Sequence, residues 1–536
     1  MAVMIGSLAP RSTVFDNGRL ELSGALGTQT VQVGTNTFVY VAGQDDAGIS
    51  GFRVNANGTL TNVANRADSP DLALSGVANF ATASVDGTTY LYANSTYENG
   101  ITVFRVNPTG TLARVDVYFD SFDVGSGPLE LAGSTGRMSI AVVNGNPRLV
   151  VSGANDDGFS VFQIGNDGRL SRLANRTDEA DPQYELNGAM DTATAVVGGR
   201  SLIFVAGRDD AGISSFELRP DESLAFRDSY SDNEGPQASL SGVTGLATVA
   251  VAGATYVVAA GQYDNGVTSL AVNASGDLTF ADNLIDTTSS GLAGASSVTS
   301  FRLEGESFVA VSARNDDALS LVHVGRGGQL TEVTRVFDTE GTALGGTHYN
   351  SFAVVGGRPM LLATGADDDG LTAFEIGGRN DRLVGGRAAD VLLGLGGNDV
   401  LIGNGGNDRL IGGLGADRLV GGTGRDVLSG GAGADDFVFT SLAHSGTSAA
   451  TADVIRGFGR GVDDIDLMAI DAKAGTLRND AFVLDTNGSF SAGEIRQRVV
   501  SDGLLIQLNV DADPQAEMAI LLAGAQARLA ASDFLL

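Results

Sequence analysis

Aspartate recurs at every ninth position through the glycine-rich segment 377–440. It stands at positions 381, 390, 399, 408, 417, 426 and 435, and a large apolar residue follows two positions after each one, from Leu383 to Phe437. A flexible linker has no reason to keep such a period. The period instead predicts short strands joined by tight glycine turns, with the apolar side chains stacked inward along a parallel β-roll.

This tract resembles the nonapeptide repeats of RTX (hemolysin-type) calcium-binding proteins, whose pattern is G-G-x-G-x-D-x-U-x. The resemblance implies that two nonapeptides complete one coil, and that carboxylates and turn carbonyls of stacked coils form all-oxygen sites suited to Ca²⁺. Seven repeats give at most five sites (7 − 2 = 5) if an ion lies between the loops of repeats n and n + 2. Without calcium, the like charges and narrow core predict a disordered tract, and ligation then supplies the folding energy.

The expected calcium ligands are side-chain carboxylates and turn carbonyls. The first two repeats are degenerate, because Arg379 and Ala388 stand where later repeats have glycine. We therefore rank Asp381 below the other aspartates, together with Asp453 and Asp466, which follow the repeats. The expected carboxylate ligands are Asp390, Asp399, Asp408, Asp417, Asp426 and Asp435. The expected carbonyl ligands are Gly394, Gly396, Asn398, Gly403, Gly405, Asn407, Gly412 and Gly421.

Residues 435–536 resemble the C-terminal module of serralysin-type secreted proteins, with the motifs D-F-V-F, D-V-I-x-x-F and D-x-I-D-L within 436–467. The final ASDFLL (531–536) resembles the acidic and hydrophobic ending of type I secretion substrates. These resemblances imply that a type I secretion apparatus exports the unfolded chain from a Gram-negative cell, and that the chain folds in the calcium-rich medium. The serralysin zinc motif H-E-x-x-H is missing, since His323, His348 and His444 are the only histidines.

Seven units of about 50 residues precede the glycine tract. Each contains a marker such as LSG and a turn such as DDxG, as in VYVAGQDDAGISGFRV (39–54). Short strands between tight turns, four to a unit, predict a seven-bladed β-propeller that resembles the lactonase-like and quinoprotein-like propellers. The last unit lacks a fourth strand, and residues near 12–16 resemble one. We expect them to complete the last blade and so remove exposed sheet edges.

The expected fold is all-β, with a propeller over 1–376, an RTX β-roll over 377–440, and a serralysin-like module with its secretion signal over 441–536. The net charge of −31 argues against nucleic acid and anionic membranes as main partners and favours divalent cations. The absence of cysteine excludes disulfides, zinc–thiolate sites and thiol catalysis. The sequence contains no run of about 18 apolar residues, so no membrane span is predicted. The first residues lack the pattern of a cleavable signal peptide.

The DDxG turns are expected to place many aspartates on one rim of the propeller, where they either cap turns or bind cations. His348 is the candidate for acid–base chemistry near the channel mouth, with Arg208, Arg314, Tyr97 and Tyr263 as expected neighbours. One function left open is a binding, adhesion or surface-assembly module for a cell-surface or matrix component. The other is a secreted hydrolase of the lactonase or phosphoesterase kind. Near-identical blades favour the first, and the acidic chain further predicts calcium-mediated self-assembly.

Overall fold

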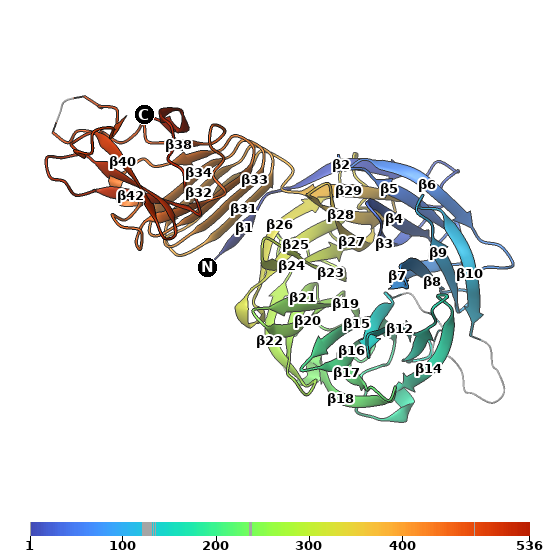
Figure 1. Ribbon diagram of the computed structural model, residues 1–536. Helices are drawn as coiled ribbons and strands as arrows, with labels where there is room; N and C mark the ends of the chain where they lie inside the picture. Colours follow the sequence, from blue (N-terminus) through green and yellow to red (C-terminus); the bar gives the residue numbers. More distant parts are fainter. Residues whose placement is uncertain (1, 121–130, 132, 134–135, 235–237, 476–477) are drawn as a thin grey trace. The chain divides into compact units, whose positions relative to one another are not determined.

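The chain is almost entirely β-structure, as its sequence predicted. The computed structural model describes residues 2–120, 131, 133, 136–234, 238–475 and 478–536. The chain divides into two compact units, Pro10–Glu375 and a second formed by Met1–Ala9 with Ile376–Leu536. Figure 1 shows a ring of sheets for the first and a stack of parallel strands for the second. Among the described residues, no helix has the length and apolar character needed to cross a membrane.

Seven four-stranded sheets form the first unit, within the part of the chain that the structure describes. Each is a propeller blade of consecutive strands, except the last, where β2 (Leu8–Phe15) lies beside β29 (Gly370–Ile376). The start and the end of the ring are therefore joined within one sheet, in which β2 covers the edge of β29.

The strands of the blades have the following bounds. They are β3 (Ala25–Val33), β4 (Asn36–Gly43), β5 (Gly48–Val54) and β6 (Leu60–Ala67); β7 (Val77–Val85), β8 (Thr88–Ser95), β9 (Gly100–Val106) and β10 (Leu112–Phe119); β11 (Ser139–Val143), β12 (Asn146–Gly153), β13 (Gly158–Ile164) and β14 (Leu170–Thr177); β15 (Ala189–Val197), β16 (Arg200–Gly207), β17 (Gly212–Leu218) and β18 (Leu224–Ser231); β19 (Val243–Val251), β20 (Ala254–Gly261), β21 (Gly266–Val272) and β22 (Leu278–Ile285); β23 (Ala295–Leu303), β24 (Glu306–Ala313), β25 (Ala318–Val324) and β26 (Leu330–Phe337); and β27 (Thr347–Val355), β28 (Arg358–Gly365), β29 and β2. Short 3₁₀ turns lie at η1 (Asp178–Ala180), η2 (Asp232–Glu234) and η3 (Arg326–Gly328).

Apolar side chains between facing blades hold the ring together. Residues 38–42 of β4 are buried on both faces, because the second strand of a blade lies between two neighbouring sheets. Between the last blade and the first, Val41 and Phe52 belong to one cluster with Met360 and Leu371. The ring therefore closes through apolar packing as well as through β2, and burial of this kind is the main source of its stability.

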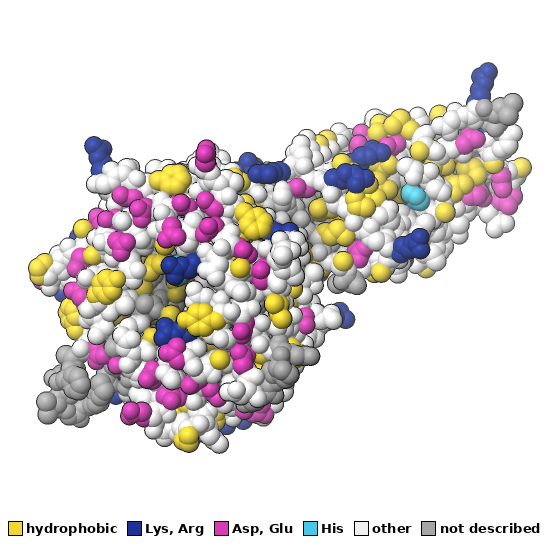
Figure 2. Space-filling model, turned by 180° about the vertical axis from the view of Figure 1, so that it is seen from behind, with side chains coloured by type: hydrophobic (Ala, Val, Ile, Leu, Met, Phe, Trp, Pro, Cys, Tyr) yellow, Lys and Arg dark blue, Asp and Glu magenta, His cyan; other side chains and the backbone are white. Residues whose placement is uncertain are grey.

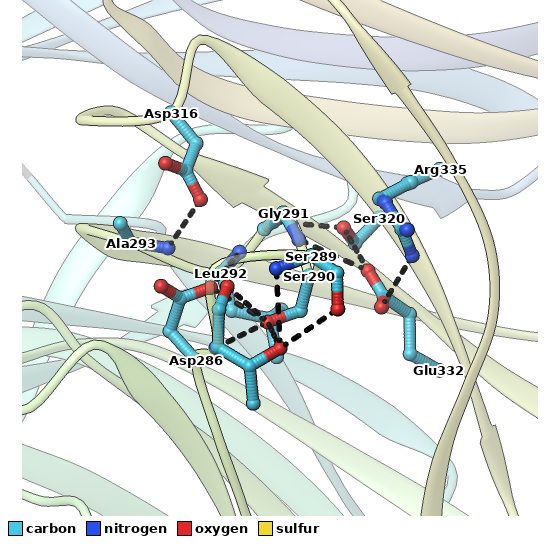
Figure 3. A network of polar contacts seen from close by, with 11 residues as sticks. Asp286, Ser289, Ser290, Gly291, Leu292, Ala293, Asp316, Ser320, Glu332 and Arg335 are labelled. Carbon is cyan, nitrogen blue, oxygen red and sulfur yellow. Dashed lines mark hydrogen bonds and ion pairs between the residues drawn. The ribbon is translucent and has the colours of Figure 1, made fainter.

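Aspartates of the DDxG turns cap the loops that carry the glycine markers. In the sixth blade, the Asp316 carboxylate accepts a hydrogen bond from the backbone N–H of Ala293 at 2.9 Å (Figure 3). In the first blade, Asp46 accepts from the N–H groups of Leu22 (3.0 Å) and Ser23 (2.8 Å). These contacts support the interpretation of the aspartates as caps, since the carboxylates satisfy loop N–H groups that strands do not pair.

The residue after this cap links its blade to the next. Asp157 has φ 50°, and its Oδ1 accepts a hydrogen bond from Gly188 N–H of the following blade at 2.8 Å. Asp369 of the last blade accepts from Gly24 of the first at 2.7 Å. Asp and Asn suit this position because they tolerate positive φ and supply an acceptor. The same link is made by Asn99, Asn265 and Asp317.

Ala211→Asn is expected to raise the melting temperature of the propeller. Ala211 (φ 54°) occupies the linking position in the fourth blade, where its methyl group provides no acceptor. Asparagine favours positive φ there and adds an oxygen for the backbone N–H of Gly242, a gain of about 0.5–1.5 kcal/mol. Scanning calorimetry of the calcium-saturated chain measures the shift. Ala252→Asn is the matched control, because Ala252 (φ 51°) lies in an exposed turn. An equal gain in both variants would mean that only turn conformation matters.

The second unit is a parallel β-roll whose successive strands alternate between two sheets. Strands two repeats apart pair in register, as β31 (Val391–Gly396) does with β33 (Arg409–Leu414), at an offset of 18 residues. Six of the seven apolar repeat residues are fully buried between the sheets, as the nine-residue period predicted, and Leu383 of the first repeat is partly buried. The six fully buried residues are Leu392, Leu401, Leu410, Leu419, Leu428 and Phe437. The other repeat strands are β30 (Arg382–Val384), β32 (Val400–Gly405), β34 (Arg418–Thr423), β35 (Val427–Ala432) and β36 (Asp436–Val438).

Both sheets of the roll continue beyond the repeats. One extends through β37 (Asp453–Arg456) into the antiparallel strands β42 (Met518–Ala523), β41 (Gly503–Asn509) and β40 (Glu494–Val500), and then β39 (Val483–Leu484). The other extends through β38 (Asp464–Asp466) to β43 (Phe534–Leu535). One apolar cluster runs from Leu392 to Phe534, so the repeats and the C-terminal module share a core. Short 3₁₀ turns lie at η4 (Leu442–His444) and η5 (Ala531–Asp533).

At the opposite end of the roll, β1 (Val3–Ile5) pairs in parallel with β31. The domain boundary predicted from the sequence places residues 1–9 in the propeller, whereas the structure places β1 in the roll. The difference has a physical reason: β31, the first repeat strand of its sheet, leaves an open edge, which a short apolar strand covers.

Candidate calcium-binding site and propeller pocket

The aspartates of the repeats form hydrogen-bonded ladders along the roll. From Asp399 to Asp435, each carboxylate accepts through Oδ1 the backbone N–H of the aspartate two repeats earlier, as Asp417 does from Asp399 and Asp426 does from Asp408, both at 2.8 Å. The ladder passes the end of the repeats at Asp453, whose Oδ1 accepts from Asp426 N–H at 2.9 Å. The repeat thereby fixes one oxygen of each carboxylate and leaves the other beside the glycine turns.

That other oxygen, Oδ2, is buried without a hydrogen-bond partner among the described residues in six roll aspartates. Burying a carboxylate oxygen without a partner is costly, and a bound cation removes the cost. A cation in contact with several such oxygens therefore fits the site. The six residues are Asp399, Asp408, Asp417, Asp426, Asp435 and Asp453.

Glycines keep open the space next to each unpartnered oxygen. A methyl group on Gly412 would lie 2.2 Å from Oδ2 of Asp417 and 2.6 Å from the carbonyl oxygen of Gly430. A methyl group on Gly403 would lie 2.3 Å from Oδ2 of Asp408. Carboxylate and carbonyl oxygens thus converge on a space that a side chain would fill, and this is the donor set that Ca²⁺ prefers.

Burial raises the pKa of these carboxyl groups. The pKa rises to about 7 for Asp399, to about 8 for Asp453, and to about 6 for Asp417 and Asp426. Neighbouring aspartates raise these pKa values further, whereas the ladder hydrogen bonds lower them. A carboxyl group that resists ionisation on its own suits a divalent cation, because the charge of the cation reverses the shift.

Two predicted ligands at the start of the tract use their carboxylates for other contacts. Asp381 accepts hydrogen bonds from Ser7 through its N–H (3.0 Å) and its Oγ–H (2.8 Å). Asp390 accepts from Ala2 N–H at 2.9 Å and from Gly386 N–H at 2.7 Å. The carboxylates of the first coil therefore accept their hydrogen bonds from protein groups. The sequence signal was present but weak, because AVMIG (2–6) follows the DVLLG spacing (390–394) with alanine in place of aspartate.

The two candidates after the repeats differ from each other. Asp466 lies 3.3 Å from the guanidinium of Arg418, so an ion pair occupies it. Asp453, ranked low from the sequence, has the same ladder bond and the same unpartnered oxygen as the repeat aspartates. The repeat period does not identify Asp453 as a member of the ladder, because the step from Asp426 to Asp453 is 27 residues instead of 18.

The predicted carbonyl ligands lie along the strand ends and turns of the roll. The carbonyl oxygen of Gly412 faces Gly394, and that of Gly421 faces Gly403, each beside an aspartate Oδ2. The carbonyls of Gly394 and Gly403 face Gly6 and Gly385 in the same way. Gly396 and Gly405 end β31 and β32. In the turns, the side-chain oxygens of Asn398 and Asn407 accept the N–H groups of Ala416 and Arg425, both at 2.9 Å.

A pocket of about 460 Å³ opens among the DDxG turns of the propeller. Figure 2 shows a face of the propeller on which acidic side chains lie around a hollow that contains basic ones. The first position of the turn lines the pocket and differs between blades, as Gln44, Arg208, Gln262 and Arg314. The third position is acidic in every blade, where it caps loops in the first and sixth blades, and the fourth position is Asp or Asn in five blades, where it links its blade to the next. The residue type therefore varies between blades at the turn position that lines the pocket, and is similar between blades at the positions that stabilise the fold.

His348, the predicted acid–base residue, lines this pocket from β27. Burial, with a smaller effect of the Arg314 charge, lowers its pKa to about 4, so the imidazole is neutral at neutral pH. Among its expected neighbours, Arg208, Arg314 and Tyr263 also line the pocket. Tyr97 instead lies with its ring against Gly76.

The other two histidines are not part of this pocket. His323 is buried in β25, with its Nε2 3.3 Å from a carboxylate oxygen of Glu306. His444 belongs to η4 of the other unit. The three histidines therefore form no common metal site.

Residues 382–536 match the protein family described as Peptidase M10 serralysin C terminal. This part of the chain is thus a serralysin C-terminal domain of the RTX type, which agrees with its parallel roll and aspartate ladders. A search of curated proteins finds no match to the chain.

The propeller is similar to several solved structures. A 6-phosphogluconolactonase from Bacteroides fragilis, described as putative, is 15% identical with a TM-score of 0.46, over 65% of this chain and 92% of that one. One from Bacteroides uniformis, described in the same way, is 18% identical with a TM-score of 0.44, over 61% and 87%. A streptogramin B lyase is 13% identical with a TM-score of 0.43, over 68% and 97%. At these identities the likeness concerns the fold.

Proposed function

We propose that the protein is secreted and that its C-terminal roll folds when calcium enters the stacked aspartate sites. The six buried carboxylate oxygens without partners carry the proposal. Because the sites exist only in the folded roll, the binding energy of calcium becomes folding energy. The match of residues 382–536 to the serralysin C-terminal family supports both calcium binding and secretion.

We further propose export by a type I secretion apparatus of a Gram-negative cell. The roll buries the terminal motif that resembles a secretion signal: Asp533 accepts a hydrogen bond from Gly461 N–H at 2.7 Å, and Phe534 joins the core. An exporter therefore has access to this motif only while the roll is unfolded. A calcium-poor cell interior and a calcium-rich medium would separate export from folding.

A calcium titration of the full chain tests the main proposal. Equilibrium dialysis at neutral pH is expected to show several ions bound per molecule, with a parallel gain of β-structure by circular dichroism. Magnesium is expected to be a poor substitute, because it requires a smaller, octahedral site. Binding with no structural change, or no binding at millimolar calcium, would refute the proposal.

We infer that the propeller acts as a binding module for a cell-surface or matrix component. The unequal turn residues around the pocket support this inference. Arg314 offers an exposed cation, Gln44 and Gln262 offer amide groups, and Tyr263 as a residue is 65% exposed. This set suits a hydroxylated, carboxylated ligand such as an acidic sugar, in which polar groups fix orientation and an aromatic ring supplies contact area.

Arg314→Gln is expected to weaken binding of a soluble polyuronate by about tenfold or more, the cost of losing one charge-assisted hydrogen bond. Surface plasmon resonance on the calcium-saturated chain measures the change. Arg326→Gln is the control, because Arg326 is an exposed arginine of the same blade in η3. Equal losses in both variants would indicate attraction by net charge only.

The second candidate function is hydrolysis at the same pocket. The neutral imidazole of His348 favours it, because a neutral histidine can accept a proton. His348→Asn separates the two functions: a hydrolase loses turnover of lactone or phosphoester substrates, whereas a binding module keeps its affinity for the polyuronate. Calcium-mediated self-assembly is a further proposal from the acidic composition, and light scattering across millimolar calcium tests it.

A further inference from the structure

Residues 2–6 occupy the position of a repeat strand that the roll's own sequence does not supply. Val3, Met4 and Ile5 pair with Val391, Leu392 and Leu393 in the parallel register that links repeat strands 18 residues apart. Because 391 − 18 = 373, Val3 lies where residue 373 would lie in a continuous repeat. Its neighbour Met4 packs against the apolar core of the roll.

The hydrogen bonds of this segment reproduce those of the repeats. Ala2 N–H donates to Oδ1 of Asp390 at 2.9 Å, as Asp390 N–H donates to Asp408 at 2.8 Å. The carbonyl oxygen of Ala2 accepts from Val391 N–H at 2.9 Å, as the carbonyl of Asp390 does from Arg409. The segment therefore enters the aspartate ladder as its first member, with only the carboxylate missing.

Gly6 and Ser7 then close the coil. A methyl group on Gly6 would lie 2.7 Å from the Gly394 carbonyl oxygen and 2.8 Å from Oδ2 of Asp381, which is the environment of a repeat glycine. Ser7 donates through its N–H and its hydroxyl to the two oxygens of Asp381. Its carbonyl oxygen accepts from Gly377 N–H at 2.9 Å. Where later coils leave a carboxylate oxygen open for a cation, a serine fills the position.

We propose that the open edge of the first coil is a strand-binding site, and that residues 2–7 dock there once calcium has folded the roll. The proposal rests on the proposed calcium-driven folding, because the edge does not exist in an unfolded roll. The docked segment leads directly into β2, the strand that completes the last blade beside β29. Calcium bound by the C-terminal domain therefore also anchors the strand that closes the propeller ring.

Hydrogen exchange of the intact chain, resolved by peptide, tests the proposal with Gly6→Val. Valine does not fit beside the backbone of Gly377 and Gly394, so residues 8–15 and 391–396 are expected to exchange about tenfold faster in saturating calcium. Gly341→Val is the control, since a Cβ on Gly341 meets open space in an exposed loop. Unchanged exchange in Gly6→Val overturns the proposal.

A peptide added in trans provides the second measurement. A labelled peptide of sequence MAVMIGSLA (residues 1–9) is expected to bind the variant lacking residues 1–7 in calcium and not in chelator, by fluorescence anisotropy. No binding in calcium, or equal binding in chelator, overturns strand docking as proposed. Hydrogen exchange of residues 400–438 monitors the folding of the roll separately. If calcium does not change this exchange, the proposal that calcium folds the roll is refuted.

Discussion

In the calcium-free protein, the roll is expected to be more stable toward unfolding at pH 5 than at pH 8. Burial raises the pKa of Asp399 to about 7 and that of Asp453 to about 8, well above the value of about 3.9 for an unfolded chain. A carboxyl group whose pKa is raised by folding stabilises the folded state fully when the pH lies below its pKa in the unfolded chain. This stabilisation is lost progressively as the pH rises from about 4 to the folded pKa values of about 6 to 8. Each unit of raised pKa corresponds to about 1.4 kcal/mol, so several such groups together decide whether the calcium-free roll is folded.

Urea unfolding followed by circular dichroism measures this effect. The transition that calcium shifts belongs to the roll. Without calcium, this transition is expected at pH 5 and is expected to be lost at pH 8, where the roll is unfolded. In saturating calcium the direction reverses, because protons compete with the ion for the carboxylates. A calcium-free roll that gains stability as the pH rises would show that these carboxylates are not buried as the structure has them.

Asp417→Asn is expected to reduce calcium affinity by about ten- to hundredfold. This reduction is comparable to or greater than the one that follows when a residue hydrogen-bonded to a metal ligand is removed. The carboxylate of Asp417 has two tasks: Oδ1 accepts the N–H of Asp399, and Oδ2 is buried without a partner. An amide has one oxygen, so it cannot perform both tasks, and its NH₂ group repels a cation. Isothermal calorimetry of the full chain measures the loss.

Asp436→Asn is the matched control for this experiment. Asp436 lies in the same tract, and its side chain is 40% exposed beside Arg418. The substitution removes the same charge without removing a buried oxygen. Equal losses of affinity in the two variants would mean that the acidity of the tract attracts calcium and that no defined site holds it.

The sequence predicted the features that repeat and missed those that occur once. The period of the aspartates and of Leu392 to Phe437 is local, so it revealed the roll, its core and most of the carboxylates. Likewise, seven similar units revealed the blades. The role of residues 2–7 depends on contacts across 374 and 388 positions, from Ser7 to Asp381 and from Ala2 to Asp390. No local pattern reports such contacts.

The pocket of the propeller shows the same limit. The recurring aspartates drew attention in the sequence, yet the structure uses Asp46 and Asp316 as caps. The variable residues Gln44 and Gln262 had no pattern to identify them, whereas Arg208 and Arg314 were expected beside His348. The place of the two glutamines at the pocket became evident only once the structure showed which turn position faces it.

Hydrogen exchange of the intact chain at pH 8, with and without calcium, tests most directly whether calcium folds the roll. Without calcium, residues 391–438 are expected to exchange at the rate of an unstructured chain, and saturating calcium is expected to protect them. The inner blades, from β7 to β22, are expected to remain protected in both conditions. Equal protection of 391–438 with and without calcium would contradict the account, because it would mean that the roll folds without a cation at its buried carboxylates.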